Sequence, residues 1–245
     1  MNGRIAFIAA LPRELEPLVT HKTAKRWHKT VSDGPLHVWE YAHDKGCWVA
    51  ACAGMGQAAA CRAFAAAEAG GTLDCVVTVG IAGAIDKRAR AGYVYSASLV
   101  IDTNTGERYK PAHWLKHWLV LVSTPHVADA LEKRRLHEAY GAGLADMEGA
   151  TVARLAESRK IPFYCFKAIS DDADAKLPNL NLFIGINGQL QTRKFIFYAM
   201  LRPWLWPSLF ALGKNSKRGA VNLAEAIYDW IDERAYIRKQ ELRQR

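Results

Sequence analysis

The segment Leu144-Ala145-Asp146-Met147-Glu148-Gly149-Ala150 places two acidic residues after a short apolar run that begins at Gly143. Glu148 precedes further apolar residues, within positions 152–156, whose spacing is typical of one face of a helix. The segment therefore predicts a strand that ends at a carboxylate and a helix that begins beside it. Such a helix would hold the Glu148 side chain on a rigid element.

A second acidic cluster follows about twenty residues later. The apolar run 161–169 predicts another strand, and Ser170, Asp171 and Asp172 come directly after it. In open α/β sheets, ligands bind outside the carboxyl ends of the strands. We therefore expect Glu148 and Asp171 to face one pocket. The alternative for Ser170 and Asp171 is a helix cap, a position that suits both residue types.

The rest of the chain alternates between strand-like and helix-like patterns, which predicts an α/β fold. We interpret 29–36 and 103–113 as loops, because they are polar or contain Gly and Pro. Strands are expected over 5–9, 37–41, 47–53, 75–79, 93–102 and 119–123, and helices over 57–69, about 127–140 and about 220–240.

Composition favours one domain over residues 1–245, with 50% hydrophobic and 23% charged residues. The five cysteines form no CxxC pair, and the histidines show no metal-binding spacing, so we expect free thiols, a reducing cytoplasm and no metal site. The apolar run 5–11 leads into Arg13, Glu14 and Glu16, and reads as a first strand rather than a signal peptide.

The tail has an unusual composition. Residues 187–219 mix aromatic and leucine side chains with basic ones, and Pro203 and Pro207 interrupt a run too broken to span a bilayer. Contact with a membrane surface and packing of a helical flap on the core both stay open. Nucleic acid ranks last, since no recognition motif accompanies the charge. Residues 175–224 contain no acid and seven basic residues: Lys176, Arg193, Lys194, Arg202, Lys214, Lys217 and Arg218.

Two glycine-bearing turns are expected at the same edge of the sheet. Gly54-Met55-Gly56 follows one predicted strand, and Gly80-Ile81-Ala82-Gly83 follows another. Glycine lets the backbone approach a ligand closely, and exposed N–H groups bind an anion or a hydroxyl. Glu14 follows the first strand in the same way, although an acid there also suits the solvated first turn of a helix.

Together these segments resemble the purine nucleoside phosphorylase and methylthioadenosine/S-adenosylhomocysteine nucleosidase superfamily. The resemblance implies a central mixed, twisted sheet flanked by helices. The tail, with Asn187-Gly188 and Leu201-Arg202-Pro203, looks like that of the hopanoid-associated phosphorylases. The resemblance covers residues 4–174 and rests on 5–11 with Glu14, 53–56, 76–84 with Gly92, Asp146-Met147-Glu148, and Ala168-Ile169-Ser170-Asp171.

The resemblance implies cleavage of the N-glycosidic bond of a purine nucleoside, with adenine as the expected base. Asp171 would protonate or hydrogen-bond N7 of the leaving base, and Glu148 would bind the ribose hydroxyls and favour the cationic transition state. Met147 would pack beneath the sugar, and Glu14 would position and deprotonate water. The resemblance also implies a homodimer or higher oligomer, and the aromatic tail suits a large apolar 5′ group such as that of adenosylhopane. The substrate-binding set is Met147, Gly54, Gly80, Ile81, Ala82, Gly83, Lys167 and Ser170.

Three positions depart from the family pattern. Adenine-releasing nucleosidases of this group have serine where this chain has Ile81, and arginine where it has Lys167. The phosphorylases place an arginine near Thr78. Water and inorganic phosphate therefore both stay open as the nucleophile, since backbone amides with Arg13 or Lys167 would still bind phosphate. A nucleoside-binding module of the same fold, with turnover lost, is the alternative to an enzyme.

Overall fold

The structure, a computed structural model, describes residues 3–21, 27–43, 46–112, 117–175, 177–185 and 188–243. Within these residues, single helices separate runs of one to five strands, and the last elements are all helical. The strands are β1 (Gly3–Ala9), β2 (Trp27–Asp33), β3 (Leu36–His43), β4 (Gly46–Cys52), β5 (Cys75–Thr78), β6 (Ile81–Ala84), β7 (Val94–Asp102), β8 (Arg108–Tyr109), β9 (Trp118–Ser123), β10 (Leu144–Asp146) and β11 (Phe163–Asp171). The helices are α1 (Pro12–Val19), α2 (Gln57–Ala69), α3 (Ala130–Tyr140), α4 (Gly149–Ser158), α5 (Thr192–Met200) and α6 (Trp206–Arg243), with 3₁₀ turns η1 (Leu180–Phe183) and η2 (Pro203–Leu205).

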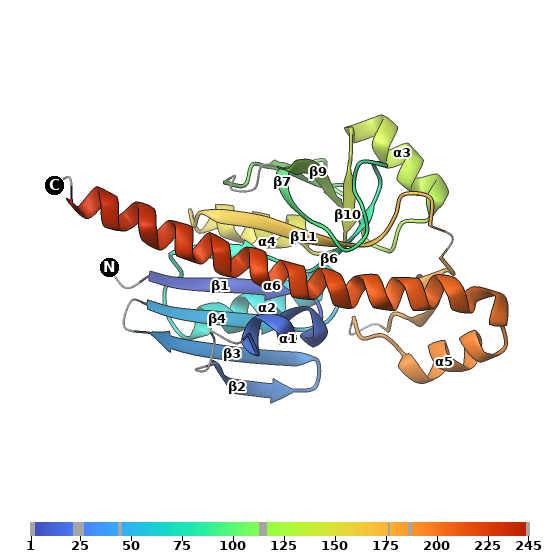
Figure 1. The fold of residues 1–245 in the computed structure, drawn as a ribbon, viewed down its shortest axis with the longest axis horizontal. Helices are drawn as coiled ribbons and strands as arrows, with labels where there is room; N and C mark the ends of the chain where they lie inside the picture. Colours follow the sequence, from blue (N-terminus) through green and yellow to red (C-terminus); the bar gives the residue numbers. More distant parts are fainter. Residues whose placement is uncertain are drawn as a thin grey trace.

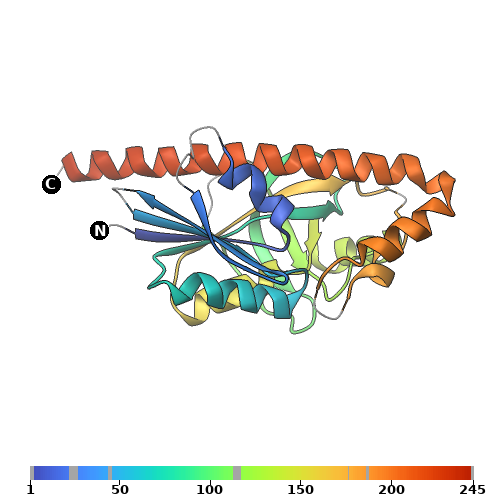
Figure 2. The same cartoon turned by 90° about the horizontal axis from the view of Figure 1, so that it is seen from below.

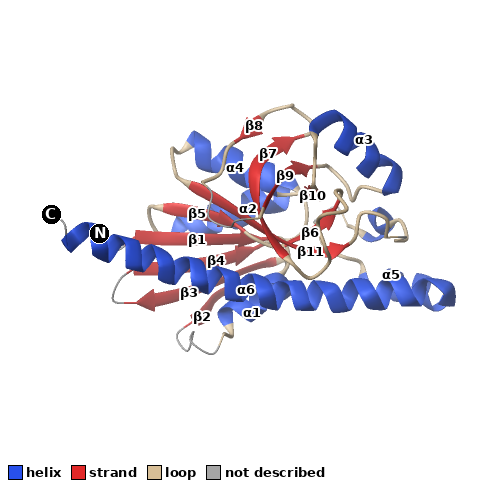
Figure 3. Cartoon of the chain, turned by 45° about the horizontal axis from the view of Figure 1, so that its top comes forward, coloured by secondary structure: helices blue, strands red, loops and turns tan. Residues whose placement is uncertain are grey.

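The strands of the described residues form one mixed, twisted sheet in the order β2-β3-β4-β1-β5-β11-β6-β10-β9-β7-β8 (Figure 3). β1, β4, β5 and β11 are parallel neighbours, so their carboxyl ends lie at one edge. An additional antiparallel pairing of β11 with β7 closes β11-β6-β10-β9-β7 into a ring. The expected α/β class with a mixed sheet flanked by helices is confirmed.

Helices cover both faces of the sheet. In Figures 1 and 2, α6 runs the length of the molecule on one face, and α2 and α4 lie on the other. The α2 side contains many small side chains, such as Ala59, Ala63 and Ala156, which let the helices pack closely on the sheet around Phe64. On the opposite side, α1 and α6 bury larger residues, including Leu15, against β1 and β11.

Four expectations about the elements are wrong. Residues 29–36, interpreted as a loop, belong to a β-hairpin, β2 and β3, whose turn contains Gly34 at φ +53°. β2 is an edge strand with mostly polar, exposed side chains, so its sequence lacks the apolar pattern of a strand. Of the turn predicted at 80–83, only Gly80 lies in a turn, because Ile81–Ala84 forms β6. The loop predicted at 103–113 contains the short strand β8. The last helix begins at Trp206 rather than near residue 220.

The long helix α6 packs on the sheet through buried residues that include one tryptophan. Trp230 has no exposed surface and meets Phe7, Tyr164 and Phe166 edge-on, with ring centroids 4.9 to 6.4 Å apart. Nearer the start of α6, Gly219 lies against β11, where an added Cβ would approach the Ala168 Cβ to 3.0 Å. The helix is therefore fixed by close backbone approach at one point and by a large ring at another.

We expect Trp230→Ala to destabilise the fold by about 3–5 kcal/mol, because it leaves a cavity between α6 and the sheet. Denaturant unfolding measures the change. Asp229→Ala is the matched control, since Asp229 is exposed on the same turn of the helix. Equal stability of the two variants would contradict this role for Trp230.

Candidate active site

The predicted site residues meet where the strands end. β10 ends at Asp146, β11 ends at Asp171, and Gly80 follows β5. Glu14 lies on α1 just after β1, with a side-chain oxygen 3.0 Å from the position that a Cβ on Gly80 would occupy. Glu14, Glu148 and Asp171 are all buried. The structure thus brings the three predicted catalytic residues to one edge of the sheet.

A buried ion pair lies beneath this edge. The Lys167 Nζ is 2.8 Å from the Asp146 Oδ2, and both side chains are almost fully buried. Asp146 also accepts hydrogen bonds from the Ser123 hydroxyl at 2.6 Å and the Gly149 amide at 2.9 Å. Burial opposes the charge of Lys167, but Asp146 and the neighbouring Cys165 and Glu148 outweigh it and raise the pKa of the ammonium above its usual value. Lys167 therefore stays a cation and faces Asp146.

Glu148 lies directly after this pair, at the start of α4. Its Oε1 accepts a hydrogen bond of 2.6 Å from the Gly56 amide. Burial, followed by the charge of Asp146, raises its pKa to about 7, although Lys167 and the Gly56 amide partly oppose the shift. Glu148 therefore gains or loses its proton near neutral pH, where a change of protonation can alter activity.

Glu14 is buried rather than solvated. Its Oε2 accepts hydrogen bonds from the amides of Ala10 and Leu11, at 3.0 and 3.1 Å. Burial raises its pKa, while the Leu11 amide and the charge of Lys167 act in the opposite direction. A carboxyl group that holds a proton more readily than usual is suited to accepting one from water. The alternative of a solvated helix acid is wrong.

Asp171 forms a second buried ion pair, with Lys133 of α3. The Lys133 Nζ is 2.6 Å from the Asp171 Oδ2, and the Ser170 hydroxyl donates to Oδ1 at 2.5 Å. A β-bulge in β11 at Ser170 shifts the register, so that Asp171 lies opposite Gly83. A side chain at Gly83 would contact both members of the pair, since its Cβ would lie 3.4 Å from each.

Lys133 is a residue that sequence reasoning missed. It occupies the first turn of α3, a helix with mostly polar residues, and a lysine there normally reads as solvated. Its burial depends on the approach of α3 to β11, and no pattern in the neighbouring sequence predicts that approach. The position of Asp171 as a helix cap, the other alternative, is also excluded, because Asp171 is the last residue of β11.

The remaining predicted residues surround these groups unevenly. Met147 lies beside Gly56, with its Cε 3.9 Å from the position of a Gly56 Cβ. The Gly54 amide already donates to the Ala10 carbonyl. Ile81 packs with the apolar residues beneath α6, and Ala82 pairs with Ile169 in the sheet. The amides of β6 are thus partly used in the ladder, which leaves fewer for an anion than an open turn would.

The first part of the tail lies over this edge of the sheet. The Met55 amide donates to the Gly188 carbonyl at 2.8 Å, beside the loop that binds Glu148. On the other side, the Asn181 side chain makes hydrogen bonds of 2.8 and 2.9 Å with the backbone of Val127. We call the described residues 179–185 and 188–191 the roof segment. Asn187, part of the predicted tail signature, lies outside the described residues, as does Lys176.

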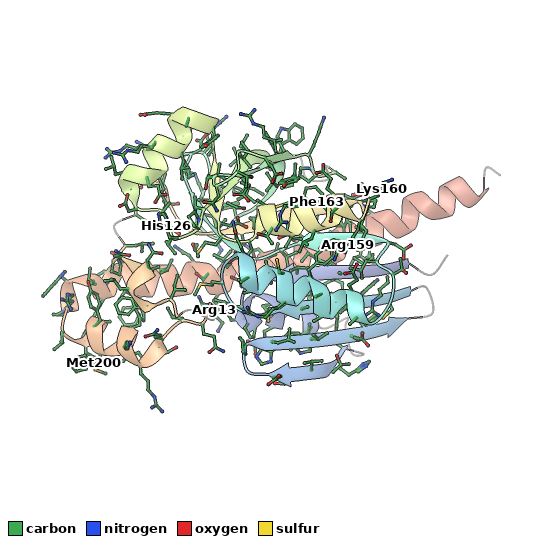
Figure 4. All side chains as sticks on the ribbon, turned by 180° about the vertical axis from the view of Figure 1, so that it is seen from behind. Arg13, His126, Arg159, Lys160, Phe163 and Met200 are labelled. Atoms are coloured by element: carbon green, nitrogen blue, oxygen red, sulfur yellow. The ribbon has the colours of Figure 1, made fainter. Side chains whose placement is uncertain are left out.

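A surface hollow of about 610 Å³ lies elsewhere, between the end of α2 and the start of β11. Arg159 and Lys160 line it, together with Glu68 and Asp74. Figure 4 shows Arg159 and Lys160 at the opposite end of α2 from Arg13. The hollow is therefore at the amino ends of the parallel strands and holds none of the predicted site residues.

The fold matches solved nucleosidases. The 5′-methylthioadenosine/S-adenosylhomocysteine nucleosidase of Helicobacter pylori is 14% identical to this chain, with a TM-score of 0.71. The match covers 95% of this chain and 99% of the nucleosidase chain. The futalosine hydrolase of the same organism is 14% identical with a TM-score of 0.72, at 95% and 99% coverage. The Arabidopsis thaliana 5′-methylthioadenosine nucleosidase is 18% identical with a TM-score of 0.72, at 94% and 95% coverage.

The model of the phosphorylase superfamily matches residues 119–185, which include Asp146, Glu148 and Asp171. A search of curated proteins finds no match. The chain has the fold of the nucleoside phosphorylase and nucleosidase superfamily, and the predicted resemblance to this superfamily is confirmed.

If Glu148 stabilises a cationic transition state, as the resemblance implies, it must be ionised, and we expect activity to rise with pH through its pKa of about 7. The profile of kcat/KM against pH measures this rise. Glu148→Gln should lower kcat/KM and remove the rise, and Glu157→Gln, on the exposed side of α4, is the control.

Stability should show the opposite trend. The folded state keeps a proton on Glu148 that the unfolded chain, with a pKa of 4.5, releases. The free energy of unfolding therefore falls as pH rises from about 4.5 to about 7. Glu148→Gln should flatten this decline, and a decline of equal depth in both proteins would contradict the assignment.

Proposed function

We propose that this chain cleaves the N-glycosidic bond of an adenine nucleoside, with water as the attacking nucleophile. The observation that supports this most directly is the placement of two buried carboxyls, Glu14 and Glu148, which form none of the ion pairs found among the described residues, at the same strand ends as the Lys133–Asp171 ion pair. Glu14 and Glu148 suit a cationic sugar and its nucleophile. Lys133 and Asp171 suit a departing base.

Water is favoured over phosphate by charge. The charged groups that act on Glu148 are two carboxyls, Asp146 and Glu14, and one ammonium, Lys167. Lys167 is committed to Asp146 by a 2.8 Å contact. A phosphate anion entering beside these carboxyls is repelled, whereas water is not. Arg13, the other cation considered for phosphate, is exposed on α1.

Adenine is favoured by the pattern of donors and acceptors. Adenine presents an acceptor at N7 and a donor at its 6-amino group, whereas 6-oxopurines present two acceptors. The Lys133 ammonium only donates and the Asp171 carboxylate only accepts. The pair therefore matches the N7 edge of adenine, with Lys133 toward N7 and Asp171 toward the amino group.

The reaction then assigns one task to each residue. The C1′–N9 bond breaks and its electron pair goes to the base, which gains a proton at N7 from Lys133. This role moves from Asp171, the donor that the resemblance implied, because the Asp171 carboxylate accepts hydrogen bonds from Lys133 and Ser170. Glu148 accepts hydrogen bonds from the ribose hydroxyls and favours the positive charge that develops on the sugar. The oxygen of water attacks C1′, and Glu14 takes its proton. Met147 packs beneath the sugar.

The test is release of adenine from adenosine, methylthioadenosine and a 5′-alkyl-substituted adenosine, with and without phosphate. We expect release that does not depend on phosphate, and loss of about 10²-fold in kcat for Lys133→Met. Arg134→Met, an exposed neighbour on α3, is the control. Phosphate-dependent release with formation of a sugar 1-phosphate would overturn the role of water. Nucleoside binding without release would favour the binding-module alternative.

We also propose a large apolar 5′ substituent, such as the hopanoid of adenosylhopane. The roof segment lies over the site and leads into α5, whose Phe195 and Tyr198 pack around Phe183 at centroid distances of 5.3 and 5.0 Å. An apolar group that leaves the ribose toward this segment would meet aromatic side chains. Equal kcat/KM for adenosine and its 5′-alkyl derivative would contradict this proposal.

A homodimer is part of the same proposal, because the superfamily resemblance implies one. Light scattering of the purified chain, coupled to size-exclusion chromatography, measures its mass in solution. A monomer at the concentrations used for activity would contradict the proposal without affecting the assignment of the catalytic residues.

We expect Asp171→Asn to relax the choice of base. An amide at this position offers a donor to a 6-oxo group, so the ratio of kcat/KM for adenosine over inosine should fall by about 10- to 100-fold. Asp174→Asn is the control, since Asp174 is exposed a few residues along the chain. An unchanged ratio in Asp171→Asn would contradict the pairing of Asp171 with the amino group.

A further inference from the structure

The junction of α5 and α6 exposes an unusual concentration of large apolar side chains. Seven of the twelve exposed large hydrophobic residues in the described part of the chain lie between positions 196 and 210. In Figures 1 and 3 this junction projects beyond the sheet, and Figure 4 shows Met200 at its outer end. We call this surface the apolar corner: Ile196, Phe197, Met200, Leu201, Trp204, Trp206 and Phe210.

The corner has an ordered framework. The Trp206 indole N–H donates to the Ala199 carbonyl at 2.8 Å, which ties the start of α6 to the end of α5. The Arg202 guanidinium stacks over the Tyr198 ring at 3.8 Å. Tyr198 in turn packs on Phe183 of the roof segment. One side of α5 is thus packed on the protein, while Phe197 and Met200 on the other side remain 66% and 65% exposed.

This arrangement separates the two alternatives for the tail. A flap that only packs on the core would bring its aromatic residues against the protein, as α5 does at Phe195 and Tyr198, which are half-buried around Phe183. Trp204 and Phe210, however, are 70% and 73% exposed. Exposed large apolar side chains that gather at one junction, unlike single scattered ones, are typical of an interaction site.

The charges around the corner are of one sign. Arg193 and Lys194 are exposed at the start of α5, and Lys214 and Lys217 are exposed on α6. Residues 175–224 contain no acidic residue. Apolar and tryptophan side chains flanked by exposed cations are the combination that inserts into the interface of an anionic lipid bilayer.

We propose that the apolar corner docks on an anionic membrane surface. A second copy of the chain fits less well, because the chain has a net charge of +9 and an interface between like corners would bring basic side chains together. No single helix among the described residues is long and apolar enough to cross a membrane. The pair Thr192–Met200 and Pro203–Glu233 passes that test only together, with a bend of 109° at their junction. A bend of this size suits a corner that rests in the lipid interface.

Docking would bring the candidate active site close to the lipid. The roof segment, which contacts Met55 through Gly188, continues directly into α5. A substrate with an apolar portion would then reach the site from the membrane rather than from water. The docking proposal itself does not rest on the proposed function, because vesicle binding is measured without substrate.

Co-sedimentation with vesicles tests the proposal. The full chain is mixed with vesicles of phosphatidylcholine alone, or of phosphatidylcholine with phosphatidylglycerol. We expect partitioning at least about ten-fold stronger to the anionic vesicles, since each basic residue near the surface contributes about 1 kcal/mol, about five-fold. Equal recovery with both vesicle types would overturn the proposal.

Two pairs of substitutions separate the apolar from the electrostatic contribution. Trp204→Ser with Phe210→Ser removes apolar surface, and should weaken binding to anionic vesicles by about ten-fold or more. Arg193→Gln with Lys194→Gln removes charge, and should abolish most of the preference for anionic lipid. Unchanged thermal unfolding checks that each variant is folded, because these four side chains are exposed.

Matched changes on α3 serve as controls. Leu131→Ser alters another exposed apolar residue, and Arg134→Gln with Arg135→Gln removes the same amount of charge. Both should bind vesicles as the parent does. Equal losses in the α3 variants would show a general effect of charge and hydrophobicity, and would overturn the assignment to the corner. A second result would also overturn the proposal. The parent chain would not bind vesicles but would self-associate, and Trp204→Ser with Phe210→Ser would abolish that self-association.

Discussion

The ion pair between Lys167 and Asp146 is the constraint on which the site depends. It joins β11 to β10, and Asp146 also binds the Ser123 hydroxyl of β9 and the Gly149 amide that opens α4. Because both charges are removed from water, the pair is tolerable only with such additional hydrogen bonds. The same contacts fix where α4 begins, and therefore where Glu148 lies. The charge of Asp146 also contributes to the raised pKa of Glu148.

The site has two halves that differ in electrostatic environment. In one half, Glu14 and Glu148 are buried, no cation among the described residues lies at ion-pair distance from either, and burial raises the pKa of both. In the other half, Lys133 lies 2.6 Å from Asp171. Both halves are built from carboxyl groups at strand ends, so sequence position alone does not distinguish them. The two halves therefore differ in their neighbours: Asp171 contacts a cation directly, whereas burial and the charge of Asp146 raise the pKa of Glu148 to about 7.

The sequence predicts the central strands and α2 well, because their apolar periodicity and glycine punctuation are local signals. It also predicts the convergence of Glu14, Glu148 and Asp171, since the carboxyl ends of parallel strands share an edge. It fails at β2, whose exposed polar side chains give no strand pattern, and at Lys133, whose burial arises from a long-range approach of α3 to β11. Ile81 shows the same limit, because only the packing of α6 decides which side of the sheet it faces.

The tail combines features that conflict in an ordinary globular domain. Its aromatic residues divide between two directions: Phe195 and Tyr198 stabilise the roof segment, while Trp204 and Phe210 face solvent. Burying the second group against the core would require α5 and α6 to fold back, but the hydrogen bond from Trp206 to Ala199 fixes their junction. An exposed apolar surface held in place by its own hydrogen bonds is costly in water alone. Contact with a lipid bilayer would remove that cost. The basic residues of the segment, which contains no acidic residue, would hold the surface against anionic lipid.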